Sequence, residues 1–475
     1  MDPLLLTGLG ILLIGLAILG LRLDAFLALV LTALIIGALT PAATLERQAL
    51  AQGASAEEAL RASTQSTGER VARAFGRTAG SIGILIALAA VIGRAMLESG
   101  AADRIIRTAL EVVGVRLAPI GFSLGGFVLA IPVFFDTVFY LTMPLGRALA
   151  LRTGTRYGLY VMTIAGGATI AHSLVPPTPG PLLVASALNV DIGQMMVVGL
   201  ALGLVATMAG WAYAYAIDSR WPVPLRETPD MSVDALRAIA ARETSSLPPL
   251  WLAVLPVVLP VVLIGGQSLL ATAPAVTSTS GTEALWIGWL RAAGDKHVAL
   301  TIAMVIALGV MVRSQGTALL HSAVPQAIAG AGTIILVTAA GGAFGSILQD
   351  TGVGDSLQQL AAGGRVGILP LAFLATALIR TAQGSATVAM ITVVGMVSGL
   401  ATPEALGFAP VYLAAAIGFG SKPFSWMNDS GFWVVSRMSG MTATETLRNF
   451  SLQITVMGVA GLIATMAAAA WIPLL

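Results

Sequence analysis

Residues 417–432 read IGFGSKPFSWMNDSGF, and this stretch decides how the chain is folded. It lies inside a long apolar region, yet it carries Lys422, Asn428 and Asp429 among glycines and a proline that a continuous helix disfavours. A charged side chain at bilayer depth costs at least about 2.5–3.5 kcal/mol, and broken backbone is tolerated there only inside protein or beside a wet cavity. The stretch is therefore a candidate binding site. A polar loop on the membrane surface is the alternative.

A second stretch has the same character. Residues 166–181 read GGATIAHSLVPPTPGP, are apolar on both sides and hold one ionisable residue, His172. The two stretches are 251 positions apart when Gly180 is placed on Gly431. This spacing indicates an internal repeat.

The composition is that of a polytopic membrane protein. Hydrophobic residues make up 57% of the 475 and charged residues 10%, whereas a soluble domain has roughly 25% charged residues. The net charge of +2 is too small to indicate a nucleic-acid partner, and the lack of cysteine excludes disulfide and thiolate chemistry. His172, His297 and His321 show no metal-ligand spacing, and no cofactor is predicted. The N-terminal MDPLLLTGLG has no basic leader, so it is interpreted as a first membrane helix.

Apolar segments long enough to cross a bilayer lie at 4–20, 24–40, 79–97, 157–190, 195–217, 250–270, 298–312, 322–349, 408–436 and 451–473. Two of them, 157–190 and 408–436, are too long for one straight helix and contain the broken stretches. Two further apolar runs, 118–146 and 366–400, are interrupted by IPVFFDT at 131–137 and RTAQGSAT at 380–387. Each run is predicted to be a re-entrant hairpin, with a pair of ordinary crossings as the alternative.

These features predict an all-α polytopic membrane protein with two inverted repeats, each containing a re-entrant hairpin and a broken transmembrane helix. LESGAAD at 97–103 resembles QDTGVGD at 349–355, and the hairpin tips and broken helices recur at offsets between 250 and 252. A constant offset across three separate features is not expected by chance. The predicted divisions are 1–78 for N-terminal helices and a polar insertion, 79–217 for the first repeat, 218–321 for a polar linker and connecting helices, and 322–475 for the second repeat. The insertion 41–78, which could form a surface amphipathic helix, and the insertion 271–297 have no predicted role.

The basic residues orient the repeats. With these crossings, 14 arginines fall on one side of the membrane and eight basic residues, five of them in 41–78, fall on the other. The positive-inside rule places the first side in the cytoplasm. Hairpin 118–146 then enters from the cytoplasm and hairpin 366–400 from outside, which is the inverted arrangement of many secondary transporters.

The four broken elements, 131–137, 380–387, 172–181 and 420–431, are expected to converge at one site. Half-helices that begin at such breaks direct free N–H groups and the positive end of their dipole into the site, and this favours an anion. Lys422 and Arg380 add positive charge. The candidate substrate-binding residues are His172, Ser173, Thr178, Gln383, Gly384, Ser385, Thr387, Lys422, Ser425 and Asn428. This set suits a small polyhydroxylated carboxylate, although any single Ser or Thr can instead bond to a neighbouring helix.

Three intramembrane groups can change charge and are candidates for carrying a coupling proton: Asp429, Asp136 and His172. Asp429 is ranked first because it shares its break with Lys422 and Asn428. A structural ion pair, Lys422 with Asp429 or Arg380 with Asp136, is the alternative role for these charges.

The segments that carry these residues resemble the gluconate permease family. IPVFFDTVFYLTMPL, AHSLVPPTPGPL, RTAQGSATVAMIT and NDSGFWVVSRMSGM look like its signature segments, and the likeness covers about 80–215 and 320–470. The resemblance implies proton-coupled uptake of gluconate or a related sugar acid across a bacterial inner membrane. It also implies kinship with the Ion Transporter superfamily, whose members are often homodimers with a scaffold domain and a moving elevator domain. Within the matching motifs it points to Asp136, His172, Gln383, Thr387, Asn428 and Asp429, with Lys422 just before the last motif.

Two other functions stay open. A sodium-coupled carboxylate carrier would use the oxygens of GSAT and NDSG at the helix breaks. An intramembrane enzyme would use His172 with Asp136 or Asp429, but the chain has no metal motif and no GxSxG elbow.

Overall fold

The computed structural model describes residues 2–474 apart from 22, 52–53, 155, 227–246, 273–288, 290, 354–366, 399–400, 402–405 and 428. Every regular element in these described ranges is helical. The helices are α1 Pro3–Gly15, α2 Ala25–Leu39, α3 Ala42–Ala51, α4 Ala56–Thr64, α5 Thr67–Glu98, α6 Ala101–Val113, α7 Ala118–Leu129, α8 Phe135–Thr153, α9 Tyr157–Leu174, α10 Pro179–Ala187, α11 Ile192–Arg220, α13 Leu250–Thr272, α15 Lys296–Gln315, α16 Leu320–Asp350, α18 Ile368–Gln383, α19 Ala386–Val397, α21 Pro410–Gly420, α22 Ser430–Ser439, α23 Ala443–Thr446 and α24 Leu452–Trp471. A π-helical turn, η7 Leu447–Ser451, joins α23 to α24.

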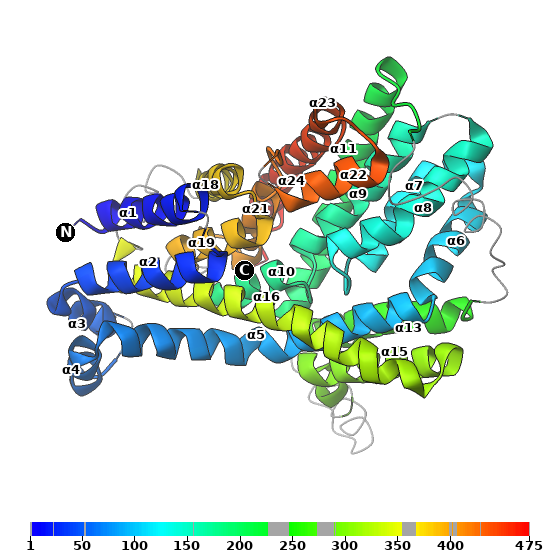
Figure 1. The fold of residues 1–475 in the computed structure, drawn as a ribbon. Helices are drawn as coiled ribbons and strands as arrows, with labels where there is room; N and C mark the ends of the chain where they lie inside the picture. The colour runs from blue at the N-terminus through cyan, green and yellow to red at the C-terminus, as the bar shows by residue number, and fades with distance from the viewer. Residues whose placement is uncertain are drawn as a thin grey trace.

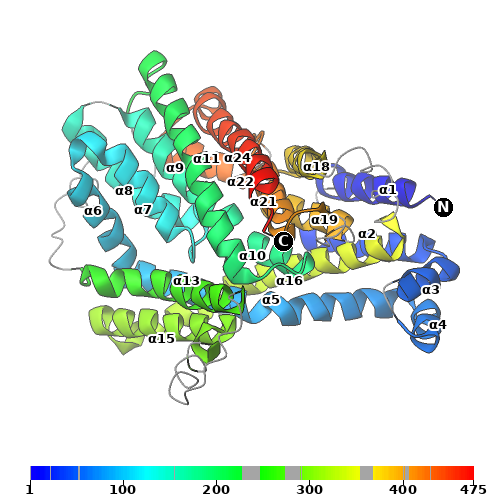
Figure 2. The same cartoon turned by 180° about the vertical axis from the view of Figure 1, so that it is seen from behind.

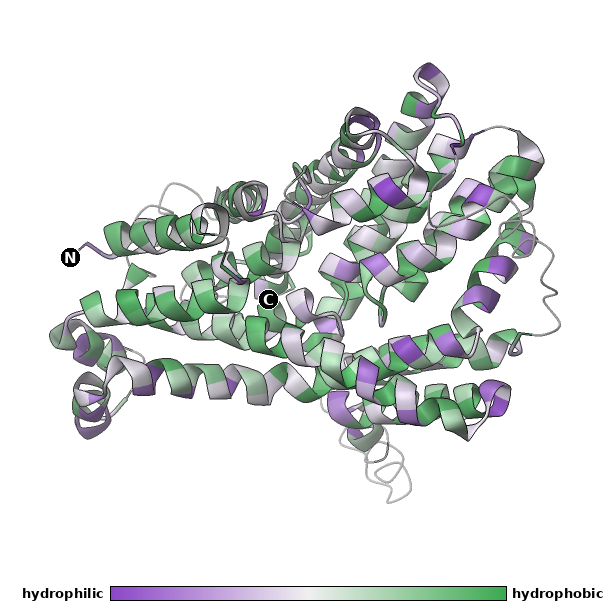
Figure 3. Cartoon of the chain, viewed as in Figure 1, coloured by the Kyte–Doolittle hydropathy of each residue, from purple (hydrophilic) through white to green (hydrophobic). Residues whose placement is uncertain are grey.

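Seven of the described helices are long and apolar enough to cross a membrane, or up to nine if each bent pair of helices counts as one span. Hydrophobic residues predominate along most of the helices, and hydrophilic residues are found on α3 and α4 and also on other helices such as α6 (Figure 3). The predicted class, an all-α multi-pass membrane protein, is confirmed.

The two longest helices, α5 and α16, pack side by side along one side of the molecule (Figures 1 and 2). The short helices α3 and α4 lie at the N-terminal end of α5, and α13 and α15 lie toward its other end. The insertion 41–78 therefore forms two short helices and the start of α5 rather than one surface helix. Helix α5 begins at Thr67 instead of 79 because the Ser66 hydroxyl caps it, accepting a hydrogen bond from the Glu69 N–H at 3.2 Å.

Both interrupted apolar runs form helix–turn–helix hairpins. In the first, α7 and α8 are joined by residues 130–134, and in the second, α18 and α19 are joined at Gly384 and Ser385. Gly384 has φ +79°, a conformation that favours glycine and lets the chain reverse there. Helices α7 and α19 have 12 residues each, about 18 Å, which is too short to cross a hydrocarbon core of about 30 Å.

The two long apolar segments are broken as their sequences predict. Helices α9 and α10 are separated by residues 175–178, and α21 and α22 by residues 421–429. Pro179 is the first residue of α10, where its missing N–H costs no helical hydrogen bond. Asp429 caps α22, because its Oδ1 accepts a hydrogen bond from the Gly431 N–H at 2.9 Å.

Helix starts recur at a nearly constant spacing along the chain. Helix α8 begins at Phe135 and α19 begins at Ala386, 251 residues later. The same spacing separates the starts of α10 and α22, and of α11 and α23, whereas α7 and α18 start 250 residues apart. The spacing predicted from sequence motifs therefore extends to the helices themselves. The opposite orientation of the two halves stays a prediction.

Helices α16 and α19 approach each other closely at two glycines. A Cβ atom added to Gly345 would lie 2.8 Å from the Cα atom of Gly395, closer than real Cβ atoms approach other atoms. The short arm of the second hairpin thus packs directly on the backbone of one of the two longest helices.

We expect the Gly345→Ala variant to be less stable than the wild type by about 1–3 kcal/mol, because the added methyl group must push two helix backbones apart. Thermal unfolding of the purified protein in detergent measures the effect. Gly330→Ala, on the same helix, is the matched control, since no atom beyond its own stretch of helix backbone lies within 4 Å of its Cβ position. Equal unfolding temperatures for the two variants would contradict the close approach.

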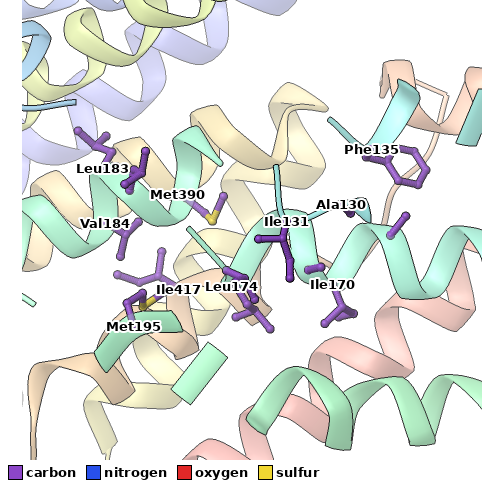
Figure 4. Packing of buried hydrophobic residues seen from close by; sticks show 14 of the residues in the cluster. Ala130, Ile131, Phe135, Ile170, Leu174, Leu183, Val184, Met195, Met390 and Ile417 are labelled. Carbon is purple, nitrogen blue, oxygen red and sulfur yellow. The ribbon is translucent and has the colours of Figure 1, made fainter. Parts of the chain in front are cut away.

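The breaks are held together by apolar packing. Figure 4 shows buried side chains of this core that come from different elements: Ile131 after α7, Leu174 at the end of α9, Met390 on α19 and Ile417 on α21. Polar groups at the breaks are therefore surrounded by a well-packed apolar layer.

Candidate functional site

All four broken elements line one cavity of about 370 Å³. The first hairpin contributes Phe134 from its turn and Phe135, Asp136 and Thr137 from the first turn of α8. The second hairpin contributes Arg380, Gly384, Ser385, Ala386 and Thr387, and α9 contributes Thr169, His172 and Ser173. The break between α21 and α22 contributes Lys422 and Asp429, and the start of α22 contributes Ser430 and Gly431. Ile334 of α16 and Phe450 of η7 complete the lining. The segments brought together are as far apart in sequence as 134 and 450.

Most of the predicted site residues that the structure describes line this cavity. They are Asp136, His172, Ser173, Gly384, Ser385, Thr387, Lys422 and Asp429. Asn428 lies outside the described residues, and so does the side chain of Gln383.

Two of the predicted substrate-binding residues, Thr178 and Ser425, use their hydroxyl groups for hydrogen bonds within the protein. The Thr178 hydroxyl donates to the carbonyls of His172 at 2.8 Å and Val175 at 2.9 Å, which closes the turn between α9 and α10. The Ser425 hydroxyl donates to Asp429 Oδ2. Neither residue lines the cavity, so both hold the breaks in shape.

Lys422 places a positive charge at the cavity wall although only 2% of its surface is exposed. Its ammonium group donates to the Thr169 carbonyl at 3.0 Å and to the Ser173 hydroxyl. A lysine has three donors, so these bonds leave one donor free among the described contacts. The residue also joins the second break to α9, across 253 positions of sequence.

Arg380 and Asp429 form a buried ion pair. Arg380 Nη2 lies 2.7 Å from Asp429 Oδ2, and Nη1 donates to the carbonyls of Lys422 at 3.4 Å and Pro423 at 3.3 Å. The side chains are 5% and 10% exposed. The predicted pairings of Lys422 with Asp429 and of Arg380 with Asp136 are wrong, because Arg380 lies in the last turn of α18 and reaches the second break directly.

Asp136 lies in the first turn of α8 and lines the cavity. Among the described residues it forms no hydrogen bond or ion pair. Buried charges are normally paired, so a lone carboxylate in a cavity indicates a group with a function. His172 is a second such group, since its Nδ1 atom is buried without a partner in the described structure, and the ring packs edge-on against Phe134 at 5.9 Å.

The charges of the cavity separate into two sets. Arg380 and Asp429 neutralise each other, which leaves Lys422 and Asp136 as the charges that face a ligand. Helices α8, α19 and α22 also begin at lining residues, so their positive dipole ends face the cavity. The site therefore suits an anion best when Asp136 is protonated.

Some lining residues were not predicted from sequence: Thr169, Phe134, Phe135, Ile334 and Phe450. Thr169 is one helical turn before Ser173, and this i, i+4 spacing is a signal that could have identified it. Ile334 and Phe450 belong to unbroken apolar stretches of sequence that carry no such signal.

Comparison with known proteins gives a consistent result. The model of the GntP family permeases matches residues 2–471. The gluconate permease of Pseudomonas aeruginosa is 33% identical over 393 residues, which is 82% of this chain and 84% of that protein. The inner membrane permease YgbN of Escherichia coli is 29% identical over 472 residues, 96% of each chain. Among solved structures, the Alcanivorax borkumensis YdaH transporter is similar in fold, with a TM-score of 0.56, 15% identity and coverage of 85% of this chain and 88% of that one.

Proposed function

The chain belongs to the GntP permease family, and from this premise we propose that it is a secondary transporter that carries gluconate or a related small sugar acid by symport with protons. It is a multi-pass inner membrane protein. Its relatives are named permeases and transporters, which favours transport over an intramembrane reaction at His172.

The observation that carries the substrate class is the cavity of about 370 Å³ with Lys422 at its wall. The lysine has a free donor for a carboxylate, and the N-terminal ends of three helices add positive potential. Ser385 and Thr387 lie at the same cavity and can bond to substrate hydroxyls. A relative named gluconate permease supports this substrate.

For the coupling proton, the geometry favours Asp136 over Asp429. Asp429 is held by Arg380, by Ser425 and by the Gly431 N–H, and these contacts all stabilise its charged form. Asp136 has no such partner among the described residues and faces the space that an anionic substrate would enter. Protonation of Asp136 would remove a like charge from that space and so favour substrate binding. His172 stays the third candidate.

We also propose that residues 79–217 and 322–475 form two inverted repeats. In the proposed elevator movement, the hairpins and broken helices move against α5 and α16. The proposed assembly is a homodimer. The direct packing of α19 on α16 supports the sliding contact that such a movement needs.

Purified protein in liposomes tests the function. We expect gluconate to accumulate inside when the outer medium is more acidic than the lumen, and to the same extent when sodium is replaced by choline, because the proton drives the movement. Glucose, which lacks the carboxylate, should not be taken up. Accumulation that depends on a sodium gradient would instead identify a sodium-coupled carrier, and the absence of uptake for every sugar acid in a panel would contradict transport of this class.

A further inference from the structure

A second polar groove lies outside the central cavity. One part, of about 210 Å³, is lined by α3, α4, α5 and α16, and a second part, of about 350 Å³, is lined by α5, α10, α16 and α19. Four residues, Ala74, Arg77, Ser346 and Gln349, line both parts, so the groove is continuous. It runs from the insertion 41–78 to the hairpin arm that also borders the central cavity.

The groove carries three arginines, which differ in how they are bonded. Arg70 donates to Asp350 at 3.2 Å and to the Gly37 carbonyl at 2.7 Å and is largely buried. Arg73 pairs with Glu69 at 3.2 Å. Arg77 lines both parts of the groove, is exposed and has no hydrogen bond or ion pair among the described residues. Its charge interacts with Asp350 of the groove lining, a carboxylate that Arg70 already bonds, but its guanidinium donors have no partner among the described residues and are available to a ligand.

The groove approaches the central cavity along two helices. On α19, Thr387 lines the cavity and Ile391, one turn later or about 6 Å along the axis, lines the groove. On α16, Ile334 lines the cavity and Gly341 lines the groove.

Two side chains of α19, Met390 and Ile391, pack tightly against glycines of the neighbouring helices. The methyl group of Met390 is 2.1 Å from the Cβ position of Gly180, and Ile391 Cγ2 is 1.8 Å from that of Gly341, so both side chains fill the room that these glycines leave. Met390 lies beside Leu183 and Val184 of α10 in Figure 4.

We propose that this groove is an outer binding site for the carboxylate of the substrate, in which Arg77 captures the anion before it reaches the central cavity. The inference rests on the proposed function. The positive-inside rule places the insertion 41–78 outside the cytoplasm, so the groove faces the side from which a substrate is taken up. Ser346 and Gln349 supply polar groups for the substrate hydroxyls.

The absence of cysteine from the chain permits a direct test. A single Ser346→Cys substitution places a thiol in the groove, and a membrane-impermeant anionic methanethiosulfonate reports on its accessibility in right-side-out vesicles. We expect gluconate to slow the labelling several-fold, and glucose to have no effect. Gly76→Cys, one residue before Arg77 but outside the groove lining, is the matched control and should be labelled at the same rate with and without gluconate.

Adding Arg77→Gln to the Ser346→Cys protein should abolish the protection by gluconate, whereas Arg73→Gln should preserve it because Glu69 already balances that charge. In the otherwise wild-type chain, Arg77→Gln should raise the KM for uptake about threefold to tenfold at low salt, with little change in kcat, and added salt should reduce the difference.

The outcomes separate the groove from the function. Gluconate uptake without gluconate protection at position 346 would overturn the outer site and leave the transport function intact. Labelling only in inside-out vesicles, or equal protection by phosphate at the same concentration, would also overturn it. If the Ser346→Cys protein and the wild type take up no sugar acid at all, the proposed function fails.

Discussion

Replacing Arg380 by glutamine is expected to lower the free energy of unfolding by about 3–5 kcal/mol and to abolish gluconate uptake. The substitution leaves Asp429 as a buried charge without its counter-ion, at a position that is 10% exposed. It also removes the donors to the carbonyls of Lys422 and Pro423, so the break that holds Lys422 in the cavity wall loses its link to α18.

A double variant separates the charge effect from a general packing defect. In Arg380→Gln with Asp429→Asn no charge is left alone, so most of the lost stability should return. Chemical denaturation of the detergent-solubilised protein measures the free energy of unfolding of Arg380→Gln, of the double variant and of a control variant, each against the wild type. Arg70→Gln is the control. It also breaks an ion pair between two helices, α5 and α16, but the Asp350 side chain that it leaves unpaired is 30% exposed, so the loss of stability should be smaller. If the double variant is no more stable than Arg380→Gln, then the ion pair does not hold the two elements together.

The positions of the breaks could be predicted from the sequence because the chemistry that breaks a helix is local. Proline lacks an N–H and glycine accepts a positive φ, so Pro179 and Gly384 mark a helix start and a reversal wherever the rest of the chain lies. The spacing of about 251 residues between helix starts was predictable for the same reason, since the local signals that start these helices recur at that spacing.

The partners of the charged groups were not predictable. Arg380 and Asp429 are 49 positions apart, and Lys422 and Ser173 are 249 apart, so no spacing rule relates them. The choice between Asp136 and Asp429 as partner for Arg380 depends on how the hairpin tip packs against the break, which is a property of the tertiary structure. Thr178 and Ser425 show the same limit. Both are hydroxyl residues at a helix break, which made them candidates for substrate binding, but each hydroxyl donates its hydrogen bond to another residue of the same break.

This difference between the two carboxylates decides the expected behaviour of Asp136→Asn. A symporter needs a group whose protonation is tied to substrate binding, and linkage requires that substrate and proton influence each other's affinity equally. Asp136 and an anionic substrate would share one cavity, where their charges repel until the carboxylate is protonated. Asparagine mimics the protonated side chain permanently. The variant should therefore bind gluconate with an affinity that no longer depends on pH.

Transport by Asp136→Asn should separate into two behaviours in liposomes. Accumulation of gluconate against a concentration gradient, driven by an imposed pH gradient, should fall to the level of empty liposomes, because no proton can be carried. Exchange of internal for external gluconate should continue, because the loaded carrier can still move. Stability should change little, since Asp136 has no described partner to lose.

Asp429→Asn provides the contrast that makes the assignment testable. It leaves Arg380 as an unpaired buried cation, so we expect a loss of stability of about 3–5 kcal/mol together with a general loss of both accumulation and exchange. His172→Gln, which removes the third titratable group, should keep accumulation if Asp136 carries the proton. Full accumulation by Asp136→Asn would exclude Asp136, and full accumulation by all three variants would show that the coupling ion binds elsewhere. Only a selective loss of accumulation, with exchange and stability preserved, identifies a residue that carries the proton rather than one that shapes the cavity.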